Sequence, residues 1–452
     1  MMLPIDKTIA AIATPIGEGG VAMIRISGQR AFEVGSAIFS ISLATIPSHQ
    51  LTYGKIVSAD GETIDHVMLA KLQSPRSFTG LDTVEITCHG SMIIQKKILT
   101  RCIEAGATLA LPGEFSYQAF LSGKIDLAQA EAIQRLIGAK NELALKAAED
   151  QLQGRLSKLI THYRKELIEA AAIIDAWVDY PEEGLEFKTQ EELTLDLKKV
   201  LRDLKELERT FEEGRKLDTA IQLCLMGAPN AGKSSLMNAL LGYDRAIVSP
   251  YAGTTRDMLK EDVKMGEAHF SLIDTAGIRD SQDGIEQEGI KRSYAASKAA
   301  DLILYVIDAS CELTDEEKKR IESLPIDKTI LIYNKADLCH PKIPFPLFST
   351  CVLSAKTLDG VEKLKSIIEE KIFAGTLHDK GEVVITQKRH QEALSDAIVN
   401  LETVICGLNS GVSAEFISFD LKMSLKALGM IIGFDLSESV LDAIFSKFCV
   451  GK

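Results

Sequence analysis

Gly227-Ala228-Pro229-Asn230-Ala231-Gly232-Lys233-Ser234-Ser235 is the stretch that decides the fold of the middle of this chain. It follows an apolar run, 221–226, that is typical of a buried strand, and it precedes 236–241, which is typical of a helix start. A strand, a glycine-rich turn and a helix start are the setting in which G-x-x-x-x-G-K-[ST] forms a phosphate-binding loop. Backbone N–H groups then surround phosphate oxygens, Lys233 reaches the terminal phosphates, and the Ser234 hydroxyl can bind Mg²⁺.

Two stretches that follow this loop supply further groups for phosphate and metal. Gly253-Thr254-Thr255 can bring the Thr255 hydroxyl to Mg²⁺ and its N–H to the γ-phosphate. Asp274-Thr275-Ala276-Gly277 ends an apolar strand pattern, so that Asp274 can hold a Mg²⁺-bound water and the Gly277 N–H can contact the γ-phosphate. Their order along the chain is that of a nucleotide hydrolase.

Two later stretches indicate which base is bound. Asn334-Lys335-Ala336-Asp337 ends another strand pattern, and the Asp337 carboxylate can accept hydrogen bonds from N1 and N2 of guanine, which adenine cannot supply. Ser354-Ala355-Lys356 would place a backbone N–H on guanine O6. The sequence therefore predicts a GTP site made of Asn230, Ala231, Gly232, Lys233, Ser234, Ser235, Ser249, Pro250, Tyr251, Ala252, Gly253, Thr254, Thr255, Asp274, Thr275, Ala276, Gly277, Asn334, Lys335, Asp337, Ser354, Ala355 and Lys356.

The residue after Gly277 is unusual for a Ras-like enzyme. Ile278 stands where such enzymes carry the glutamine that orients the attacking water, and an aliphatic side chain cannot do this. Either the domain is a slow switch, or another residue places the water. Oxygens of Asn230 and of the segment 249–253 would lie next to the phosphates, where a monovalent cation can neutralise transition-state charge.

Composition limits the remaining possibilities. The chain has 452 residues, 46% of them hydrophobic and 25% charged, with a net charge of −13, which is ordinary for a globular protein of two to four domains. An acidic protein meets RNA only through a local basic patch or a partner. The eight cysteines show no zinc spacing and no apolar run approaches ~18 residues, so we expect reduced thiols in a cytoplasmic protein without a membrane span.

Outside the nucleotide domain, 217–375, three other regions differ in pattern. Residues 1–120 alternate strand and helix patterns, with Arg25 and Glu85 as charges inside apolar strand runs; Arg25 either faces water at a strand edge or lines a pocket for an anion. Residues 121–214 have helical spacing broken once, at 179–184, and 376–452 is helical again. Helical material on both sides predicts that the nucleotide domain is inserted into a helical one.

Several stretches outside the nucleotide domain together resemble the MnmE (TrmE) family, the GTPase subunit that modifies the wobble uridine of certain tRNAs. They are Thr8–Pro15, Arg25–Gly28, Ser77–Gly80, His89–Gly90, Pro112–Phe115, Ala119–Ala132 and the Cys-x-Gly-Lys tail Cys449–Lys452. The resemblance covers nearly the whole chain. It implies a multidomain fold: an α+β N-terminal folate-binding domain, a discontinuous helical domain and an inserted Ras-like α/β P-loop GTPase domain.

The resemblance also implies roles for matching positions. Arg25, Glu85, Lys124 and Lys452 match the site for 5-formyl-tetrahydrofolate or a related one-carbon folate. Asn230, Ser249, Tyr251 and Thr254 match a K⁺ site, while Ser234 and Thr255 hold Mg²⁺. Glu286 matches the glutamate that orients the hydrolytic water through a second water, and Cys449 is either a reactive thiol or a structural surface thiol.

The family implies partners as well. A homodimer, joined mainly through the N-terminal domains, would work with an FAD-dependent protein, MnmG (GidA), in a heterotetramer that adds an aminomethyl or carboxymethylaminomethyl group to carbon 5 of the wobble uridine, U34. Glu18, Leu81 and Ala228 depart from the family pattern, although none is a group assigned to chemistry. The alternative is a regulatory or ribosome-assembly GTPase of the Era-like type, without modification chemistry. Such proteins usually carry an RNA-binding domain and a basic surface.

Overall fold

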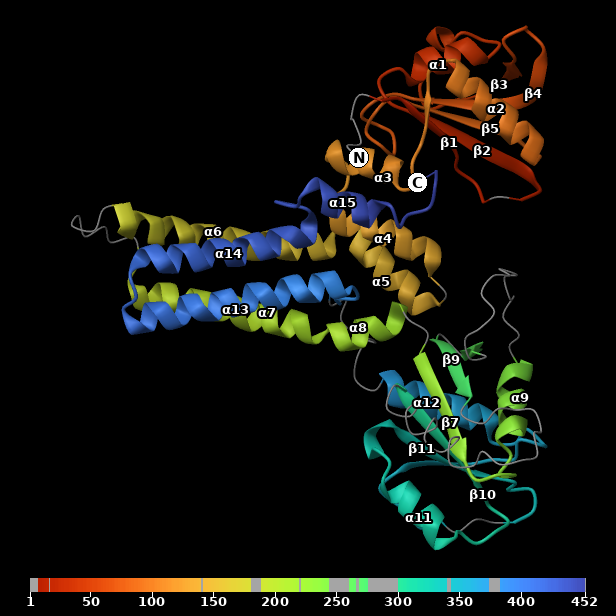
Figure 1. Cartoon of the computed structure of the whole chain (residues 1–452), viewed down its shortest axis with the longest axis vertical. Coiled ribbons are helices and arrows are strands. Elements are labelled where there is room, and N and C mark those ends of the chain that lie inside the picture. Colours follow the sequence, from red (N-terminus) through yellow and green to blue (C-terminus); the bar gives the residue numbers. More distant parts are fainter. Residues whose placement is uncertain are drawn as a thin grey trace. The chain divides into compact units, whose positions relative to one another are not determined.

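A computed structural model describes residues 7–15, 17–139, 141–179, 188–218, 221–243, 260–265, 268–274, 300–339, 343–373 and 383–451. The chain divides into two compact units (Figure 1). One contains residues 1–138, 148–205 and 392–452, and the other contains 139–147 and 206–391. Each unit is described by itself.

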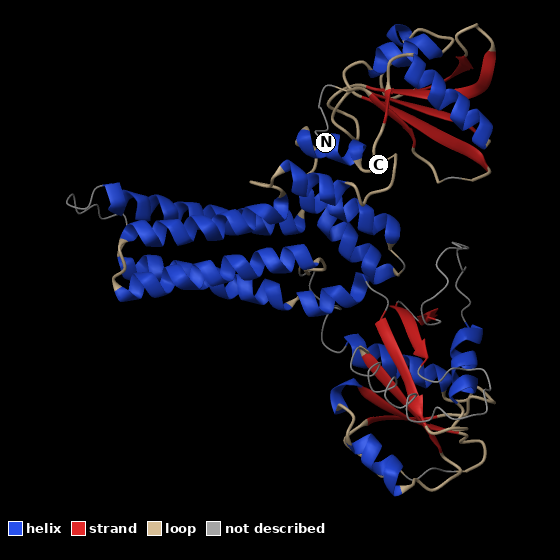
Figure 2. Cartoon of the chain, in the orientation of Figure 1, coloured by secondary structure: helices blue, strands red, loops and turns tan. Residues whose placement is uncertain are grey.

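The first unit begins with a mixed sheet and its helices. The elements are β1 (Ile9–Ile12), β2 (Gly19–Ser27), α1 (Ala31–Ile38), the 3-10 turn η1 (Leu43–Thr45), β3 (Leu51–Val57), β4 (Thr63–Leu72), β5 (Thr83–Gly90), α2 (Met92–Glu104), β6 (Thr108–Leu109) and α3 (Glu114–Leu121). The strand order is β3-β4-β5-β2-β1-β6, antiparallel except for the β1–β6 pair. Helices α1 and α2 pack on one face of this sheet (Figure 2).

Alternation along β2 explains which side chains stay accessible. Ala22, Ile24 and Ile26 are buried beneath the helices, whereas Arg25 points to the other face and is only partly buried. Arg25 pairs in register with Ala11 on one side and Glu85 on the other. It therefore lies on a central strand, and the possibility of an arginine at a strand edge is wrong.

Helices make up the rest of the first unit. They are α4 (Leu127–Gly138), α6 (Arg155–Asp179), α14 (Ala414–Ile432) and α15 (Glu438–Phe445), together with parts of α5 (Glu142–Leu152), α7 (Gln190–Arg209) and α13 (Lys388–Ser410), which the division into units cuts. The prediction of a single break in this helical region is wrong, because α5 ends before Gly154, which adopts a left-handed φ of +76° that an α-helix cannot continue. None of the described helices is both long and apolar enough to cross a membrane.

The second unit contains the nucleotide-loop sequence. Its elements are α8 (Phe211–Asp218), β7 (Ile221–Gly227), α9 (Lys233–Tyr243), β8 (Lys260–Met265), β9 (Ala268–Asp274), β10 (Leu302–Asp308), α11 (Asp315–Glu322), the 3-10 turn η2 (Ile326–Lys328), β11 (Thr329–Asn334), β12 (Ser349–Val352) and α12 (Val361–Phe373). The strand order is β12-β11-β10-β7-β9-β8, with only the β8–β9 pair antiparallel.

Parallel pairing brings the carboxyl ends of β7, β10, β11 and β12 to one edge of this sheet. The strands are apolar on both faces, since β10 and β11 are buried along almost their whole length, as expected for a parallel sheet covered by helices. Polar residues follow directly where β10 and β11 stop, at Asp308 and Asn334. In an open parallel sheet this edge is where ligands bind.

Candidate functional site

The loop after β7 has the backbone of a phosphate-binding turn. Asn230 adopts φ +61° and Gly232 φ +95°, and helix α9 begins immediately afterwards at Lys233. A Cβ at Gly232 would lie 2.1 Å from Nδ2 of Asn334, so only glycine fits there. The ammonium of Lys233 donates to the carbonyl oxygens of Gly227 at 2.9 Å and Ala228 at 2.7 Å, which keeps its charge over the loop. Backbone N–H groups at the start of α9 add positive potential there.

Asn334, at the end of β11, ties two loops together. It is almost wholly buried, with 2% of its surface exposed. Its Nδ2 donates to the carbonyl oxygen of Ala231 at 2.9 Å, and its Oδ1 accepts from the N–H of Ala355 at 3.0 Å. One amide thus fixes the distance between the phosphate loop and the 354–356 loop.

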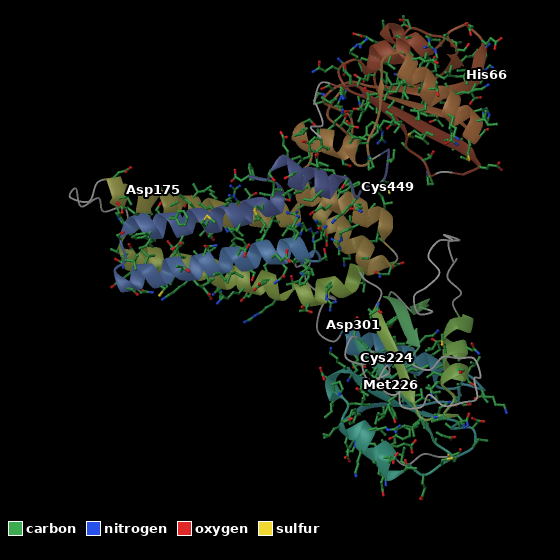
Figure 3. All side chains as sticks on the ribbon, viewed as in Figure 1. His66, Asp175, Cys224, Met226, Asp301 and Cys449 are labelled. Atoms are coloured by element: carbon green, nitrogen blue, oxygen red, sulfur yellow. The ribbon has the colours of Figure 1, made fainter. Side chains whose placement is uncertain are left out.

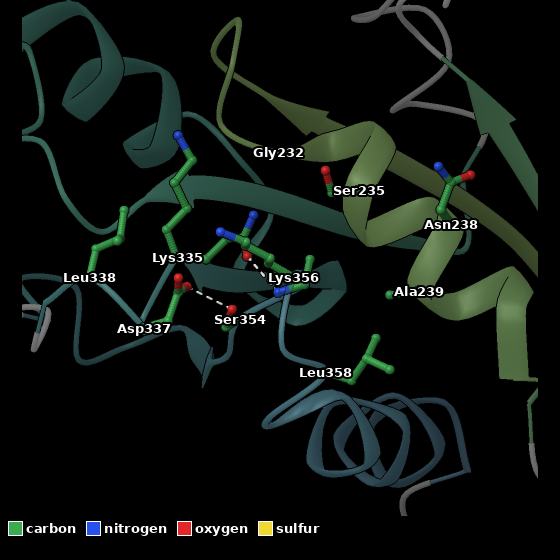
Figure 4. A pocket seen from close by; sticks show the side chains of 12 residues that line it. Gly232, Ser235, Asn238, Ala239, Lys335, Asp337, Leu338, Ser354, Lys356 and Leu358 are labelled. Carbon is green, nitrogen blue, oxygen red and sulfur yellow. Dashed lines mark hydrogen bonds between the residues drawn. The ribbon is translucent and has the colours of Figure 1, made fainter.

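Asp337 and Ser354 form the other end of the same pocket. The Ser354 hydroxyl donates to Oδ1 of Asp337 at 2.7 Å, and the Ser354 N–H donates to the carbonyl of Asp359 at 2.9 Å. This hydrogen bond orients the Asp337 carboxylate and leaves its second oxygen available as an acceptor. Figure 4 shows Asp337, Ser354 and Lys356 at one side of the pocket and Gly232 and Ser235 at the other.

The pocket between these loops has a volume of about 550 Å³, within the ordinary range for small-ligand sites. Its lining comes from the phosphate loop and α9, the end of β11 and the loop after β12: Gly232, Ser235, Asn238, Ala239, Asn334, Lys335, Asp337, Leu338, Ser354, Ala355, Lys356 and Leu358. The structure therefore brings together Gly232, Ser235, Asn334, Lys335, Asp337, Ser354, Ala355 and Lys356 of the predicted site.

Sequence reasoning missed one charged group beside this pocket. Asp308 ends β10, and its Oδ2 lies 2.5 Å from the ammonium of Lys335. Burial raises the pKa of Asp308, but the hydrogen bonds from Lys335 and Ser310 outweigh it and hold that pKa below its usual range. Asp308 follows the apolar strand pattern 302–307, just as Asp274 follows 271–273. This pattern could have identified Asp308 from the sequence.

Several predicted residues lie outside the described part of the chain. They are Ser249, Pro250, Tyr251, Ala252, Gly253, Thr254, Thr255, Thr275, Ala276, Gly277, Glu286 and Lys452. Asp274 is described only by its backbone, at the end of β9, where it pairs with Leu225 of β7. Ser234 and Ser235 are exposed on the first turn of α9.

A second group of predicted residues meets on the open face of the N-terminal sheet. Arg25 donates from Nε and NH2 to Oε1 of Glu85, both at 2.9 Å, and its guanidinium lies 5.4 Å from the Phe78 ring centre and 5.7 Å from that of Phe115. Its NH1 donates to the Gly451 carbonyl at 3.4 Å, so the C-terminal tail reaches this pair.

Lys124 lies against Gly80, two residues after Phe78, and Cys449 precedes Gly451 by two residues. The stem of Lys124 packs so closely on Gly80 that a Cβ there would come within 2.7 Å of it, and Gly80 follows the Phe78-Thr79 turn. Cys449, labelled in Figure 3, is exposed. Its carbonyl oxygen accepts from the N–H of Gly113 at 3.4 Å. By contrast, burial raises the pKa of the Cys102 thiol to about 12, which leaves it inert.

A parallel sheet, a glycine-rich loop leading into a helix, and an aspartate oriented at the base end of the pocket define a P-loop domain of the GTPase class. A family model described as GTP-binding protein TrmE N-terminus matches residues 8–124, and one described as the MnmE helical domain matches 127–449.

Curated relatives match the chain from end to end. A protein named tRNA modification GTPase MnmE, from Protochlamydia amoebophila (strain UWE25), is 49% identical over 99% of this chain and 98% of its own length. Proteins of the same name from Acetivibrio thermocellus, 39% identical over 99% of both chains, and Clostridioides difficile (strain 630), 40% identical over 99% of this chain and 100% of its own, agree. The chain belongs to the MnmE family.

Proposed function

We propose that this chain is a GTP hydrolase that acts in tRNA modification. The observation that carries the proposal is the pocket in which Asn334 joins the phosphate loop to the 354–356 loop, while Ser354 orients Asp337. The names of full-length relatives support the same activity. An Era-like protein without modification chemistry is not favoured, because the match includes residues 8–124 and 127–449 rather than the nucleotide domain alone.

Base selection follows from the hydrogen-bonding inventory of Asp337. An ionised carboxylate accepts but does not donate, so it suits the N1 and N2 hydrogens of guanine and would repel a base that presents oxygen there. The Ser354 hydroxyl holds one carboxylate oxygen, which fixes the orientation of the other. The N–H of Ala355 donates to Asn334 and that of Ser354 donates to Asp359, so we propose that the backbone N–H of Lys356 would donate to guanine O6.

The test is a substitution at Asp337 that replaces a carboxylate, which only accepts hydrogen bonds, by an amide, which also donates them. Asp337→Asn should lower kcat/KM for GTP by at least about 100-fold and improve turnover of xanthosine triphosphate, whose O2 accepts where guanine N2 donates. Asp359→Asn, the same chemical change at an exposed side chain on the loop after β12, is the matched control. Equal turnover of ATP and GTP by the unaltered protein would contradict the proposal.

We extend the proposal to metal ions. Ser234 and Thr255 would hold Mg²⁺, and Asn230, Ser249, Tyr251 and Thr254 would hold K⁺, both of which supply positive charge beside the phosphates. Glu286 would orient the attacking water, because Ile278 occupies the position where Ras-like enzymes carry the glutamine that does so. Support comes from Asn230, which lies in the phosphate loop and has a left-handed backbone with φ +61°.

Potassium dependence has a direct test. GTP turnover should be several-fold faster in K⁺ than in Na⁺ at equal ionic strength, and Glu286→Ala should lose most of the rate in K⁺. The neighbouring substitution Glu288→Ala is the control. A rate that is identical in both salts would remove the cation from the proposal without removing the GTPase activity.

We also propose that 5-formyl-tetrahydrofolate or a related one-carbon folate binds at Arg25, Glu85, Lys124 and Lys452. The guanidinium and the two phenyl rings around it offer an ion pair and flat apolar surfaces, which suit a charged aromatic ligand. The folate would supply a one-carbon unit. Cys449, exposed on the tail that Arg25 contacts through Gly451, is the candidate thiol for that chemistry.

The remaining assignments concern architecture and partners. We propose an N-terminal folate-binding and dimerisation domain (1–120), a helical domain made of 121–214 and 376–452, and an inserted Ras-like GTPase domain (217–375). A cytoplasmic homodimer would join an FAD-dependent MnmG partner and tRNA, and add the carboxymethylaminomethyl or aminomethyl group to the wobble uridine. The two separate helical segments of the first unit support the insertion.

A further inference from the structure

Lys335 is held in an uncommon conformation at the wall of the nucleotide pocket. Its φ of +66° is left-handed, which a non-glycine residue adopts only where its surroundings determine it. It lines the pocket, while Asp308, to which its ammonium is bound at 2.5 Å, does not. Figure 4 shows the Lys335 side chain extending away from Asp337. The aliphatic stem therefore faces the pocket, and the charge is drawn away from it.

Asp308 is itself fixed in place. Its Oδ1 accepts from both the N–H of Ser310, at 2.9 Å, and the Ser310 hydroxyl, at 2.6 Å. Its backbone pairs in register with Asn334, and the Ala309 N–H donates to the Asn334 carbonyl at 2.9 Å. The carboxylate thus has one oxygen for Ser310 and the other for Lys335. Because these hydrogen bonds hold the pKa of Asp308 below its usual range, its carboxylate is ionised at neutral pH.

This pair differs from an ordinary surface ion pair. Exposed pairs contribute little because both side chains are mobile and solvated. Here the lysine and aspartate side chains are only 32% and 21% exposed, and both ends are attached to strands that pair with each other. The same domain offers a contrast in Asp315, whose side chain is 93% exposed and lies 3.2 Å from Lys318 on one helix.

We infer that Asp308, supported by Ser310, is a positioning residue for the nucleotide: it holds the Lys335 stem along the pocket wall and thereby sets the affinity for guanine nucleotide. The inference rests on the proposed function, since it takes the occupant of this pocket to be a guanine nucleotide. An apolar stem held flat offers a surface for a purine ring. Without the Asp308 carboxylate, the Lys335 ammonium is free to enter the pocket. Each nucleotide that binds must then order the Lys335 side chain again, which weakens binding.

The first experiment measures binding of methylanthraniloyl-GDP to the full-length protein. Asp308→Asn should raise the Kd about five- to tenfold, mostly through faster dissociation, and raise the KM for GTP while leaving kcat nearly unchanged. Ser310→Ala should have a smaller effect, because the Ser310 N–H remains. Asp315→Asn, the same chemical change on α11, should bind like the unaltered protein.

A double-substitution cycle separates positioning from a general loss of structure. Lys335→Met keeps the stem and removes the charge, so Asp308→Asn should have no further effect in that background; additive effects would overturn the inference. Unfolding temperatures without nucleotide control for folding, and Asp308→Glu should recover part of the affinity. If the unaltered protein binds no GDP, the proposed function fails and this inference with it. Normal GDP affinity in Asp308→Asn overturns the inference alone.

Discussion

At the scale of single residues, Asn334 has the greatest influence on the nucleotide site. Both of its amide groups are used, one on the phosphate loop and one on the 354–356 loop. A change at Asn334 therefore affects phosphate and base recognition together.

Asn334→Ala tests this role. It leaves the Ala231 carbonyl and the Ala355 N–H without their amide partner, and we expect a loss of about 1–3 kcal/mol in the stability of the second unit. GDP affinity should fall with it. Thermal unfolding with and without GDP measures both. Asn238→Ala, an exposed asparagine that lines the same pocket, is the control, and equal stability of the two variants would contradict the role of Asn334.

Motif spacing was sufficient to group those pocket residues that lie at the end of a strand and in the loop that follows it. The phosphate loop, Asn334 and Asp337 follow directly from motifs at strand ends. Asp308 also ends a strand pattern, but its role depends on Lys335 at the end of a neighbouring strand, and the sequence does not give the register between the two strands. In the same way Arg25 and Glu85 were visible as charges inside apolar runs, but their pairing depends on the antiparallel register of β2 and β5.

At the scale of elements, one polar network joins α6 to α14. The Ser418 hydroxyl donates to Oδ1 of Asp175 at 2.5 Å, and the Lys422 ammonium lies 3.0 Å from the same oxygen. Figure 3 places Asp175 near the end of α6. The hydrogen bond from Ser418 lowers the pKa of Asp175 below its usual value, burial opposes it, and Lys422 lowers it further. This network fixes the register of two long helices that periodicity alone leaves free to slide.

Asp175→Asn should lower the stability of the first unit by no more than about 1 kcal/mol at pH 7, because the Asp175 side chain is 42% exposed. A carboxyl group with a lowered folded-state pKa contributes stability above its unfolded pKa, near 3.9, and loses it as the pH falls through the folded value. The difference should therefore persist from pH 8 to pH 5. Chemical denaturation at these pH values measures it, with exposed Asp396→Asn on α13 as control. A difference that vanished near pH 6 would contradict this assignment.

The helical elements also show where periodicity is insufficient. The apolar pattern continues through 143–167, yet the structure separates α5 from α6 at Gly154. Apolar residues keep their three-and-four spacing on both sides of such a break because each helix buries one face. The spacing therefore indicates that a face is buried, and it does not indicate that one helix continues. In the sequence, Gly154 marks this break, since glycine adopts a left-handed φ more readily than other residues.

At the scale of the whole molecule, the path of the chain matters most. Helices α7 and α13 run antiparallel: the Gln190 amide bonds the Leu408 carbonyl at one end, and the Lys205 ammonium lies 2.5 Å from Glu402. At the other end Nε2 of Gln391 is 3.4 Å from Oε1 of Glu208. The chain therefore leaves the helical region and returns to it at almost the same place, which is how tolerated insertions are attached.

Replacing residues 209–390 by a Gly-Ser linker of about five residues should consequently leave the first unit folded, since such a linker spans the short distance between Glu208 and Gln391. Circular dichroism should show its helices and sheet intact, and unfolding should stay cooperative. A longer deletion, 209–402, removes Glu402 and about two thirds of α13, and should destabilise the unit because α7 loses its partner. If both deletions unfold the first unit equally, its helices depend on the nucleotide domain for stability, and nucleotide-driven changes would reach them by unfolding rather than by movement of an attached domain.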